Sequence, residues 1–136
     1  MDIRPLTADY AVSPQIALED LPAIRDAGFR TVIDNRPDAE IPEPLQTEQM
    51  RAAAEALGLH FVANPIVSSA ITDENVARQR VAMADGPGPV LAYCASGNRS
   101  SIMWALAQAG EQPADVLIST PARHGYQLEW LRPHLE

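Results

Sequence analysis

Short apolar runs alternate with helix-like segments along this chain, and glycines mark the junctions. The spacing predicts a helix over 18–27 that ends at Gly28 and is followed by a strand over 29–33. The same order then returns, with a helix over 45–57, closed by another glycine, and a strand over 59–63. Alternating helices and strands with short connections favour an α/β fold whose mainly parallel central sheet is flanked by helices.

The second half of the chain repeats this order around a more apolar strand. Thr72 is placed to cap the start of a helix that runs through Ala84. Residues 89–93 (Pro-Val-Leu-Ala-Tyr) are almost wholly apolar, which is typical of a buried central strand. The segment 100–109 carries no charge, so we expect a helix that is buried on most sides.

The two ends of the chain carry weaker patterns. Residues 114–119 and 126–131 read as two short helices, which we expect to pack on the sheet. Residues 10–12 are expected to add an edge strand. At 136 residues the whole chain, 1–136, fits a single domain with one core.

Composition and charge narrow the classes of partner. The net charge of −8 argues against a nucleic acid or an anionic membrane as the partner, because both would repel such a surface. No apolar run is long enough to span a bilayer, and no signal-peptide pattern opens the chain, so we expect a cytoplasmic protein. The three histidines have no metal-ligand spacing with the single cysteine, and we expect neither a metal nor another cofactor.

That cysteine, Cys94, follows the apolar run 89–93 directly and precedes the uncharged helix. In open parallel sheets ligands bind outside the carboxyl ends of the strands, so Cys94 is expected at a site. A loop that enters a helix there turns its N–H groups towards one point and forms an anion-binding nest. The candidate binding residues are therefore those of the loop and the helix start: Ala95, Ser96, Gly97, Asn98 and Ser100.

Three side chains of this loop carry candidate chemistry. Thiolates are favoured at helix N-termini and beside guanidinium groups, which makes Cys94 the candidate nucleophile. Arg99 offers a fixed cation and a planar donor fork for an anionic substrate. Ser100 is expected to donate a hydroxyl hydrogen bond to the sulfur.

The pattern Cys-x-x-Gly-x-Arg-Ser over 94–100 resembles the active loop of single-domain rhodaneses, in which a cysteine carries a persulfide sulfur. It also resembles the loop of protein tyrosine phosphatases. That loop, however, has five residues between cysteine and arginine and usually a histidine before the cysteine, whereas this chain has four and Tyr93. A shorter ring of donors suits a single terminal sulfur better than a phosphoryl group.

A phosphatase reaction also needs a general acid for the leaving group. In the tyrosine phosphatases an aspartate upstream of the cysteine fills this role, but no carboxylate lies between Glu55 and Asp73 here. The candidate that remains is Asp38, in the loop after the strand over 29–33, because this loop is expected to open on the same sheet edge as Cys94.

A wider resemblance covers nearly the full length. It rests on four segments: 12–15 (Val-Ser-Pro-Gln), 35–40 (Asn-Arg-Pro-Asp-Ala-Glu), 93–94 (Tyr-Cys) and 104–106 (Trp-Ala-Leu). Together they are similar to the phosphatase-like domain of the β-lactamase-hydrolase-like family, found alone or fused to metallo-β-lactamase-fold hydrolases of the persulfide dioxygenase kind. The resemblance implies a three-layer, dual-specificity-phosphatase-like or rhodanese-like fold with the shorter sulfurtransferase-type loop, and such a dioxygenase as a partner.

Our leading hypothesis from the sequence is therefore sulfur transfer. Cys94 takes sulfane sulfur from thiosulfate or a persulfide and passes it to a thiol or another nucleophilic acceptor, while Arg99 holds the anionic part of the donor. Two alternatives stay open. One is a cysteine-dependent phosphatase with a phosphocysteine intermediate and Asp38 as the acid; the other is a non-catalytic sulfur carrier or anion-binding module.

Overall fold

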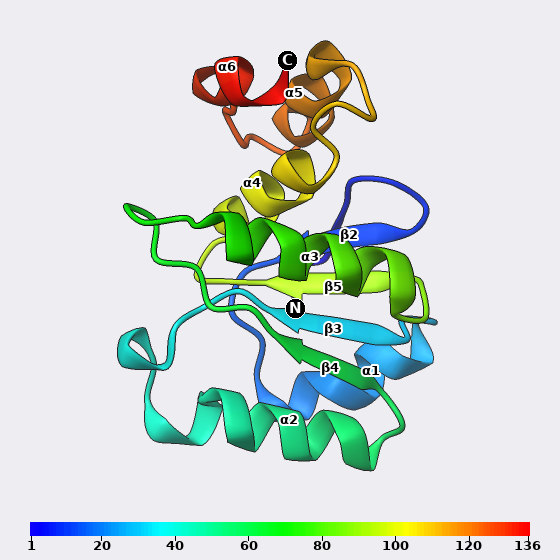
Figure 1. Ribbon diagram of the computed structural model, residues 1–136. Coiled ribbons are helices and arrows are strands. Elements are labelled where there is room, and N and C mark those ends of the chain that lie inside the picture. The colour runs from blue at the N-terminus through cyan, green and yellow to red at the C-terminus, as the bar shows by residue number, and fades with distance from the viewer.

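The computed structural model describes residues 1–136, and its centre is a five-stranded sheet (Figure 1). The strands are β1 (Arg4–Pro5), β2 (Tyr10–Ser13), β3 (Thr31–Asp34), β4 (His60–Ala63) and β5 (Val90–Tyr93), in the spatial order β1-β2-β5-β3-β4. All neighbours are parallel except the β1–β2 pair. The predicted α/β class with a mainly parallel sheet is confirmed.

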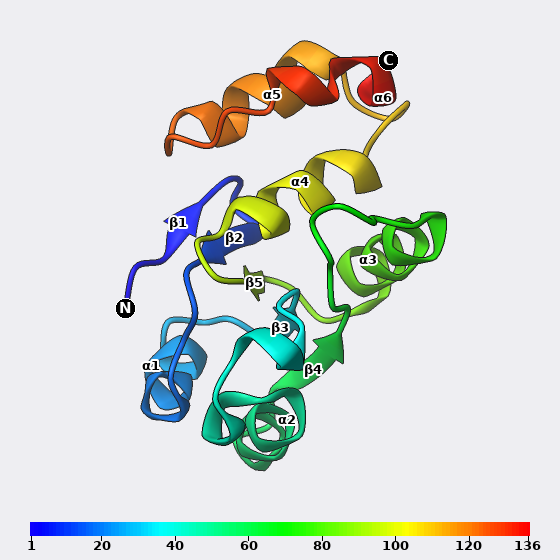
Figure 2. The ribbon, with the colours of Figure 1, turned by 90° about the vertical axis from the view of Figure 1, so that its left-hand side faces the viewer.

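Helices cover both faces of this sheet. They are α1 (Leu21–Asp26), α2 (Thr47–Ala56), α3 (Asp73–Asp85), α4 (Asn98–Ala107), α5 (Ala114–Ala122) and α6 (Arg132–Leu135). Figure 2 shows α1 and α2 on one face and α3 and α4 on the other. The predicted cap of α3 is confirmed, because the Thr72 hydroxyl accepts a hydrogen bond from the Asn75 N–H at 3.1 Å. No helix has the length and apolar character that a membrane crossing requires.

Each face of the sheet has its own apolar cluster. Beneath α1 and α2, buried residues such as Leu21, Ile24 and Met50 pack against the sheet. On the opposite face, Ile33 and Ala92 of the sheet lie in the cluster that also holds Ile102, Trp104 and Ala105 of α4. The site at the strand ends is thus held between two rigid layers.

The register of the sheet brings four strand ends level. Tyr93, the last residue of β5, pairs with Ser13 on one side and with Asp34 on the other, and Asp34 pairs with Ala63 at the end of β4. The residues that follow these strands therefore meet at one edge, which places Cys94 between the segments that follow β2 and β3. This is the edge at which parallel sheets bind ligands.

The expected edge strand at residues 10–12 occupies a different place. It forms β2, which lies inside the sheet between β1 and β5, and all four of its residues are buried. The true edge is the two-residue strand β1, which returns antiparallel through a tight connection. A strand of two residues is too short to show a periodic pattern, so the sequence analysis did not predict β1.

The sequence led us to expect the C-terminal helices on the sheet, but they do not pack there. Helices α5 and α6 lie beyond α4, and Figure 2 shows them as a further layer on its outer side. The second pattern, expected over 126–131, is helical only from a 3-10 turn at Glu129–Leu131 into α6. The reason is the apolar character of α4: its outer side must be buried against other helices, just as its inner side is buried against the sheet.

Candidate active site

The loop after β5 presents a thiol at the start of a buried helix. Cys94 is only 1 % exposed, and α4 begins four residues later at Asn98. Gly97 takes a left-handed φ of 94°, and its N–H donates to the Cys94 sulfur at 3.1 Å. A side chain at Gly97 would also clash with the Tyr126 hydroxyl, so both the backbone angle and the close approach require glycine here.

Four backbone N–H groups of the loop and the start of α4 donate to no protein atom. They belong to Ala95, Ser96, Arg99 and Ser100, whereas the Asn98 N–H donates to the Ser96 hydroxyl at 3.3 Å. Free amides at the N-terminus of α4 add to the positive end of the helix dipole. The loop therefore has the donors that a small anion bound at the sulfur requires.

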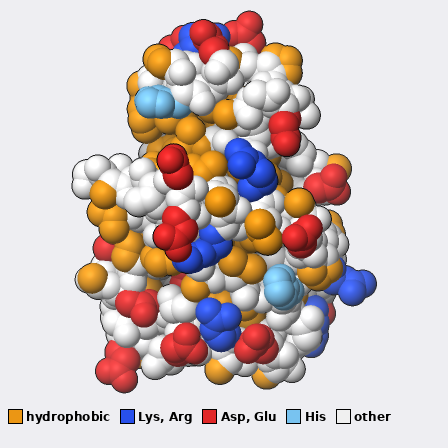
Figure 3. All heavy atoms as spheres, in the orientation of Figure 1, with side chains coloured by type: hydrophobic (Ala, Val, Ile, Leu, Met, Phe, Trp, Pro, Cys, Tyr) orange, Lys and Arg blue, Asp and Glu red, His pale blue; other side chains and the backbone are white.

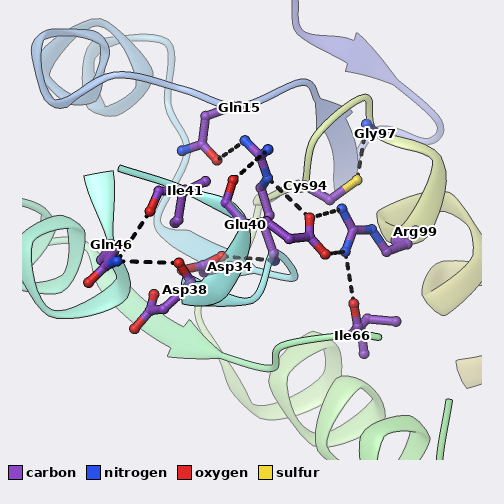
Figure 4. Close-up of polar contacts among 11 residues, drawn as sticks. Gln15, Asp34, Asp38, Glu40, Ile41, Gln46, Ile66, Cys94, Gly97 and Arg99 are labelled. Carbon is purple, nitrogen blue, oxygen red and sulfur yellow. Dashed lines mark hydrogen bonds and ion pairs between the residues drawn. The ribbon is translucent and has the colours of Figure 1, made fainter. Parts of the chain in front are cut away.

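Arg99 is 8 % exposed and is held by acceptors from two other segments. Its Nη1 donates to Glu40 Oε2 at 2.8 Å and to the Ile66 carbonyl at 2.9 Å, and its Nη2 donates to Glu40 Oε1 at 2.7 Å. The hydrogen bonds with Glu40 raise the pKa of Arg99, and the charge of Cys94 adds to the rise. Figure 4 shows the guanidinium between the Glu40 carboxylate, the Ile66 carbonyl and the sulfur.

The expectation that Ser100 donates a hydrogen bond to the sulfur is wrong. Its hydroxyl donates instead to Asn35 Oδ1 at 2.9 Å, and its carbonyl accepts from the Tyr10 hydroxyl at 2.9 Å. A side chain at the third position of α4 points into the molecule here, where it meets the segment after β3. Ser100 therefore anchors the loop from below, while its N–H stays available to a ligand.

This anchor belongs to a closed ring of buried polar side chains beneath the loop. Asn35 Nδ2 donates to Gln79 Oε1 at 3.2 Å, and Gln79 Nε2 donates to the Tyr10 hydroxyl at 3.0 Å, which completes the ring through Ser100. Asn64, after β4, joins it by donating to the same Gln79 oxygen at 3.2 Å. Buried polar groups that are fully paired specify one arrangement, so the ring fixes the loop relative to three strands and two helices.

Asp38, the candidate general acid, lies on the loop after β3 but is turned away from the thiol. Its Oδ1 accepts from the Thr47 N–H at 2.8 Å at the start of α2, and its carbonyl accepts from the Gln46 side chain at 3.3 Å. Figure 4 shows Glu40 between Asp38 and Cys94. The Asp38 carboxylate is thus placed to stabilise the N-terminus of α2.

The sequence reasoning missed two residues of the same loop, Arg36 and Glu40. Glu40 reaches Arg99 across 59 positions of the chain, and Arg36 Nε contacts the same carboxylate at 3.3 Å. Pairing with Arg99 holds the pKa of the Glu40 carboxyl below its usual range, so Glu40 is ionised at neutral pH. Their position directly after a strand whose end is level with β5 is the signal that leads to them.

A third missed residue comes from the C-terminal layer. The Tyr126 hydroxyl donates to the Ser96 carbonyl at 2.8 Å and accepts from Arg4 Nη1 at 2.6 Å. Tyr126 thereby ties the Ser96 carbonyl of the loop to the C-terminal layer. Tyr126 carries no sequence signal of its own, because it lies 30 residues after the loop it contacts.

The largest cavity of the molecule, about 390 Å³, is separate from this site. It opens between α3 and the C-terminal helices and is lined mainly by Ile71, Val76, Leu106, Leu131 and exposed Trp130. Figure 3 shows apolar side chains gathered below the C-terminal layer on this side. None of the cavities is lined by Cys94 or Arg99, and no three His, Cys, Asp or Glu side chains form a group that would hold a metal ion.

Comparison with known proteins identifies the family. The model of the phosphatase-like domain of beta-lactamase hydrolase-like proteins matches residues 2–111. The chain belongs to this family. A beta-lactamase hydrolase-like protein of Agrobacterium fabrum is 31% identical over 137 residues, covering 92% of this chain and 32% of the relative. The chain thus spans about a third of the length of the curated relatives it matches.

Solved structures share this family's fold. A Neisseria meningitidis protein solved as a candidate phosphatase is 32% identical, with a TM-score of 0.83 over 100% of this chain and 97% of its own. The core catalytic domain of the PP-IP phosphatase SIW14 from S. cerevisiae is 11% identical, with a TM-score of 0.69 over 98% and 82% of the two chains, which shows the shared fold. The chain therefore has the fold of the cysteine-dependent phosphatases, as the resemblance implied.

Proposed function

We propose that this protein is a cysteine-dependent phosphatase that hydrolyses phosphate monoesters. The observation that carries the proposal is that the loop of Cys94 combines four backbone N–H groups without a protein acceptor, the N-terminus of α4 and the Arg99 guanidinium beside the sulfur. Such a set of donors stabilises the negative charge that builds on the transferred group. The family and its phosphatase-like fold support the same reading.

The reaction follows from this arrangement in two steps. The Cys94 thiolate attacks phosphorus, the ester P–O bond breaks, and a phosphocysteine forms as the alcohol leaves. Water then attacks the phosphocysteine, the S–P bond breaks, and inorganic phosphate and the thiolate are released. Arg99 and the amides of Ala95 and Ser96 bind the phosphoryl oxygens in both steps.

Neither Glu40 nor Asp38 is available as a general acid, and this affects which substrates the protein can hydrolyse. Glu40 is ionised through its pairing with Arg99, and Asp38 is engaged at the start of α2. Without a carboxylic acid beside the leaving oxygen, water must supply its proton. We therefore propose aryl phosphates, whose phenoxides leave readily, as the preferred class over alkyl phosphates.

Sulfur transfer is the second candidate, and the spacing of the loop favours it. Four residues separate Cys94 from Arg99, one fewer than in the tyrosine phosphatase loop, and the smaller ring suits a terminal sulfur. In this reaction the Cys94 thiolate attacks the sulfane sulfur of thiosulfate, sulfite leaves, and the persulfide passes its sulfur to a thiol. A beta-lactamase-type hydrolase, as part of a longer chain or as a separate protein, is the partner we propose for either reaction.

One pair of assays distinguishes these functions. The protein and its Cys94→Ser variant are each incubated with p-nitrophenyl phosphate, and separately with thiosulfate followed by intact mass measurement. We expect turnover of the aryl phosphate that the variant lacks. A gain of one sulfur atom, released by cyanide as thiocyanate, without phosphatase turnover would overturn the proposal in favour of sulfur transfer. A gain of one sulfur atom that cyanide does not release as thiocyanate would identify the protein as a sulfur carrier.

A further inference from the structure

Glu40 meets Arg99 along a defined edge of the guanidinium group. The carboxylate accepts one hydrogen bond from each Nη, at 2.7 and 2.8 Å, in a bidentate pair. The Ile66 carbonyl takes a second hydrogen of Nη1 at 2.9 Å. Bidentate pairs of this kind fix the plane of the guanidinium as well as its position.

Counting the donors of Arg99 shows what remains for a ligand. A guanidinium has five N–H donors in a fixed fork. Glu40 and Ile66 together engage three of them, all on Nη1 and Nη2. The two that remain, the Nε hydrogen and one Nη2 hydrogen, share a single edge of the plane. Figure 4 places this edge on the side of the Cys94 sulfur.

Glu40 is itself held from behind. Arg36 Nε contacts Glu40 Oε1 at 3.3 Å, and Arg36 Nη2 donates to the Glu40 carbonyl at 3.2 Å. Arg36 Nη1 in turn donates to Gln15 Oε1 at 3.3 Å, from the segment that follows β2. The carboxylate is 39% exposed but lies between two arginines, and both pair with it.

We propose that Glu40 is a positioning residue that presents the Nε/Nη2 edge of Arg99 to an anion bound at Cys94. It does not compete with the substrate for Arg99, because it occupies the other edge. The proposal rests on the proposed function in that the bound anion is the phosphoryl group of the substrate. The lowered pKa of the Glu40 carboxyl agrees with this role, since the pair persists at neutral pH.

The test measures binding of inorganic phosphate by calorimetry in the full chain carrying Cys94→Ser, which removes turnover. Glu40→Gln, Arg99→Ala and the double variant are compared in this background. We expect Glu40→Gln to weaken binding about tenfold, because small displacements of a binding group are costly. In the Arg99→Ala background Glu40→Gln is expected to have no further effect, since Glu40 acts through Arg99.

The matched control is Glu43→Gln, which removes one negative charge from the same segment at an exposed side chain that forms no ion pair. We expect its phosphate affinity to equal that of the parent. Tighter or unchanged binding in Glu40→Gln would overturn the proposal, and so would an equal loss with and without Arg99. If Glu40→Gln fails to fold, Glu40→Asp keeps the charge but ends one methylene short of Arg99. Weakened binding in Glu40→Asp supports the proposal, and unchanged binding overturns it.

The phosphate affinities test the role of Glu40 even if the protein does not hydrolyse phosphate monoesters. Absence of aryl phosphate turnover in the unmodified protein would reject the phosphatase reaction alone. The role of Glu40 is decided by the phosphate affinities and their coupling to Arg99, which require no turnover. A lack of measurable phosphate binding in the parent would overturn the role of Glu40 toward a phosphoryl group.

Discussion

At the scale of single residues, the surroundings of Cys94 combine satisfied and unsatisfied polar groups. Tyr93, directly before it, is fully buried, and its hydroxyl makes no hydrogen bond of standard geometry although it lies beside the Asp34 carboxylate. Burial raises the pKa of Tyr93, and the nearby charge of Asp34 raises it further. The hydroxyl therefore stays protonated, and Tyr93 serves as a packing residue where tyrosine phosphatases usually carry histidine.

Replacing Tyr93 by phenylalanine tests this reading. An unpaired buried hydroxyl costs about 1 to 3 kcal/mol, so Tyr93→Phe is expected to raise the free energy of unfolding by about 1 kcal/mol. Urea unfolding followed by fluorescence measures the change, and turnover is expected to remain at the parent level. A loss of stability would mean that the hydroxyl bonds to Asp34 in solution.

Asp34 predicts a pH dependence of stability. It is 1 % exposed, and burial raises its pKa even though it accepts hydrogen bonds from the Arg36 N–H and the Thr47 hydroxyl at 2.9 Å. Because the folded pKa lies above the ordinary value of 3.8, this group's contribution to stability is present below that value. It is lost as the pH rises through the raised pKa.

The comparison with Asp34→Asn isolates this effect. The free energy of unfolding of the parent, relative to the variant, is expected to fall as the pH rises from about 3.8 and to level off above the raised pKa. Urea denaturation at a series of pH values measures the difference. A difference that grows with pH over this range would show that the hydrogen bonds to Asp34 outweigh its burial.

At the scale of elements, the loop after β3 serves two helices. Glu40 holds Arg99 of α4, whereas Asp38 accepts from the Thr47 N–H at the start of α2. The three-residue turn Asp38–Glu40 thus points its two acidic side chains towards different elements. The ring through Asn35 and Ser100 then ties this loop to α4 from below.

Variants of Asp38 separate a structural role from an acid role. Asp38→Ala is expected to lower the free energy of unfolding by about 1 kcal/mol, as the loss of a helix-capping group does. Asp38→Asn keeps an acceptor oxygen and is expected to be nearly as stable as the parent. Both should keep aryl phosphate turnover, whereas loss of a general acid would reduce the rate of both variants about a hundredfold or more.

At the scale of the whole molecule, the C-terminal layer completes the core and also reaches the site. Leu117, Leu128, Leu131 and Leu135 are buried in the same cluster as three side chains of α4. Tyr126, from the same segment, holds the Ser96 carbonyl of the loop. The family model ends at residue 111, so this layer lies outside the matched region.

A chain that ends at Glu111 is therefore expected to lose its cooperative fold. Burial of one large apolar side chain contributes about 1.5 to 3 kcal/mol, so the loss of these four leucines is comparable to the whole stability of a typical domain, about 5 to 15 kcal/mol. Near-ultraviolet circular dichroism and thermal unfolding measure the outcome. A cooperative transition close to that of the full chain would contradict the expectation.

Two point variants give the matched control within this layer. Leu128 is fully buried, and Leu128→Ala is expected to cost about 2 to 5 kcal/mol. Trp130, two residues later, is 59% exposed, and Trp130→Ala is expected to change stability by about 0.5 kcal/mol or less. Equal losses in the two variants would show that the layer is not packed as described.

Local patterns in the sequence determined the order of helices and strands, the class of the fold and the position of the loop. The apolar run 89–93, Gly97 and the uncharged segment 100–109 lie next to one another, so each predicts a local conformation without knowledge of the rest. Cys94 and Arg99 also share this short segment, which is why the sequence was sufficient to select them. Short-range preferences of the backbone and of burial act within a few residues.

Only the tertiary structure decided the partners of these side chains. Glu40 reaches Arg99 over 59 positions, Ser100 bonds to Asn35 over 65, and Asp38 is engaged at α2 rather than at the thiol. Strand register selects which segments meet at one edge, and a shift of one residue would exchange the faces of every side chain. The placement of α5 and α6 on α4 likewise depends on which apolar face remains uncovered once the sheet has formed.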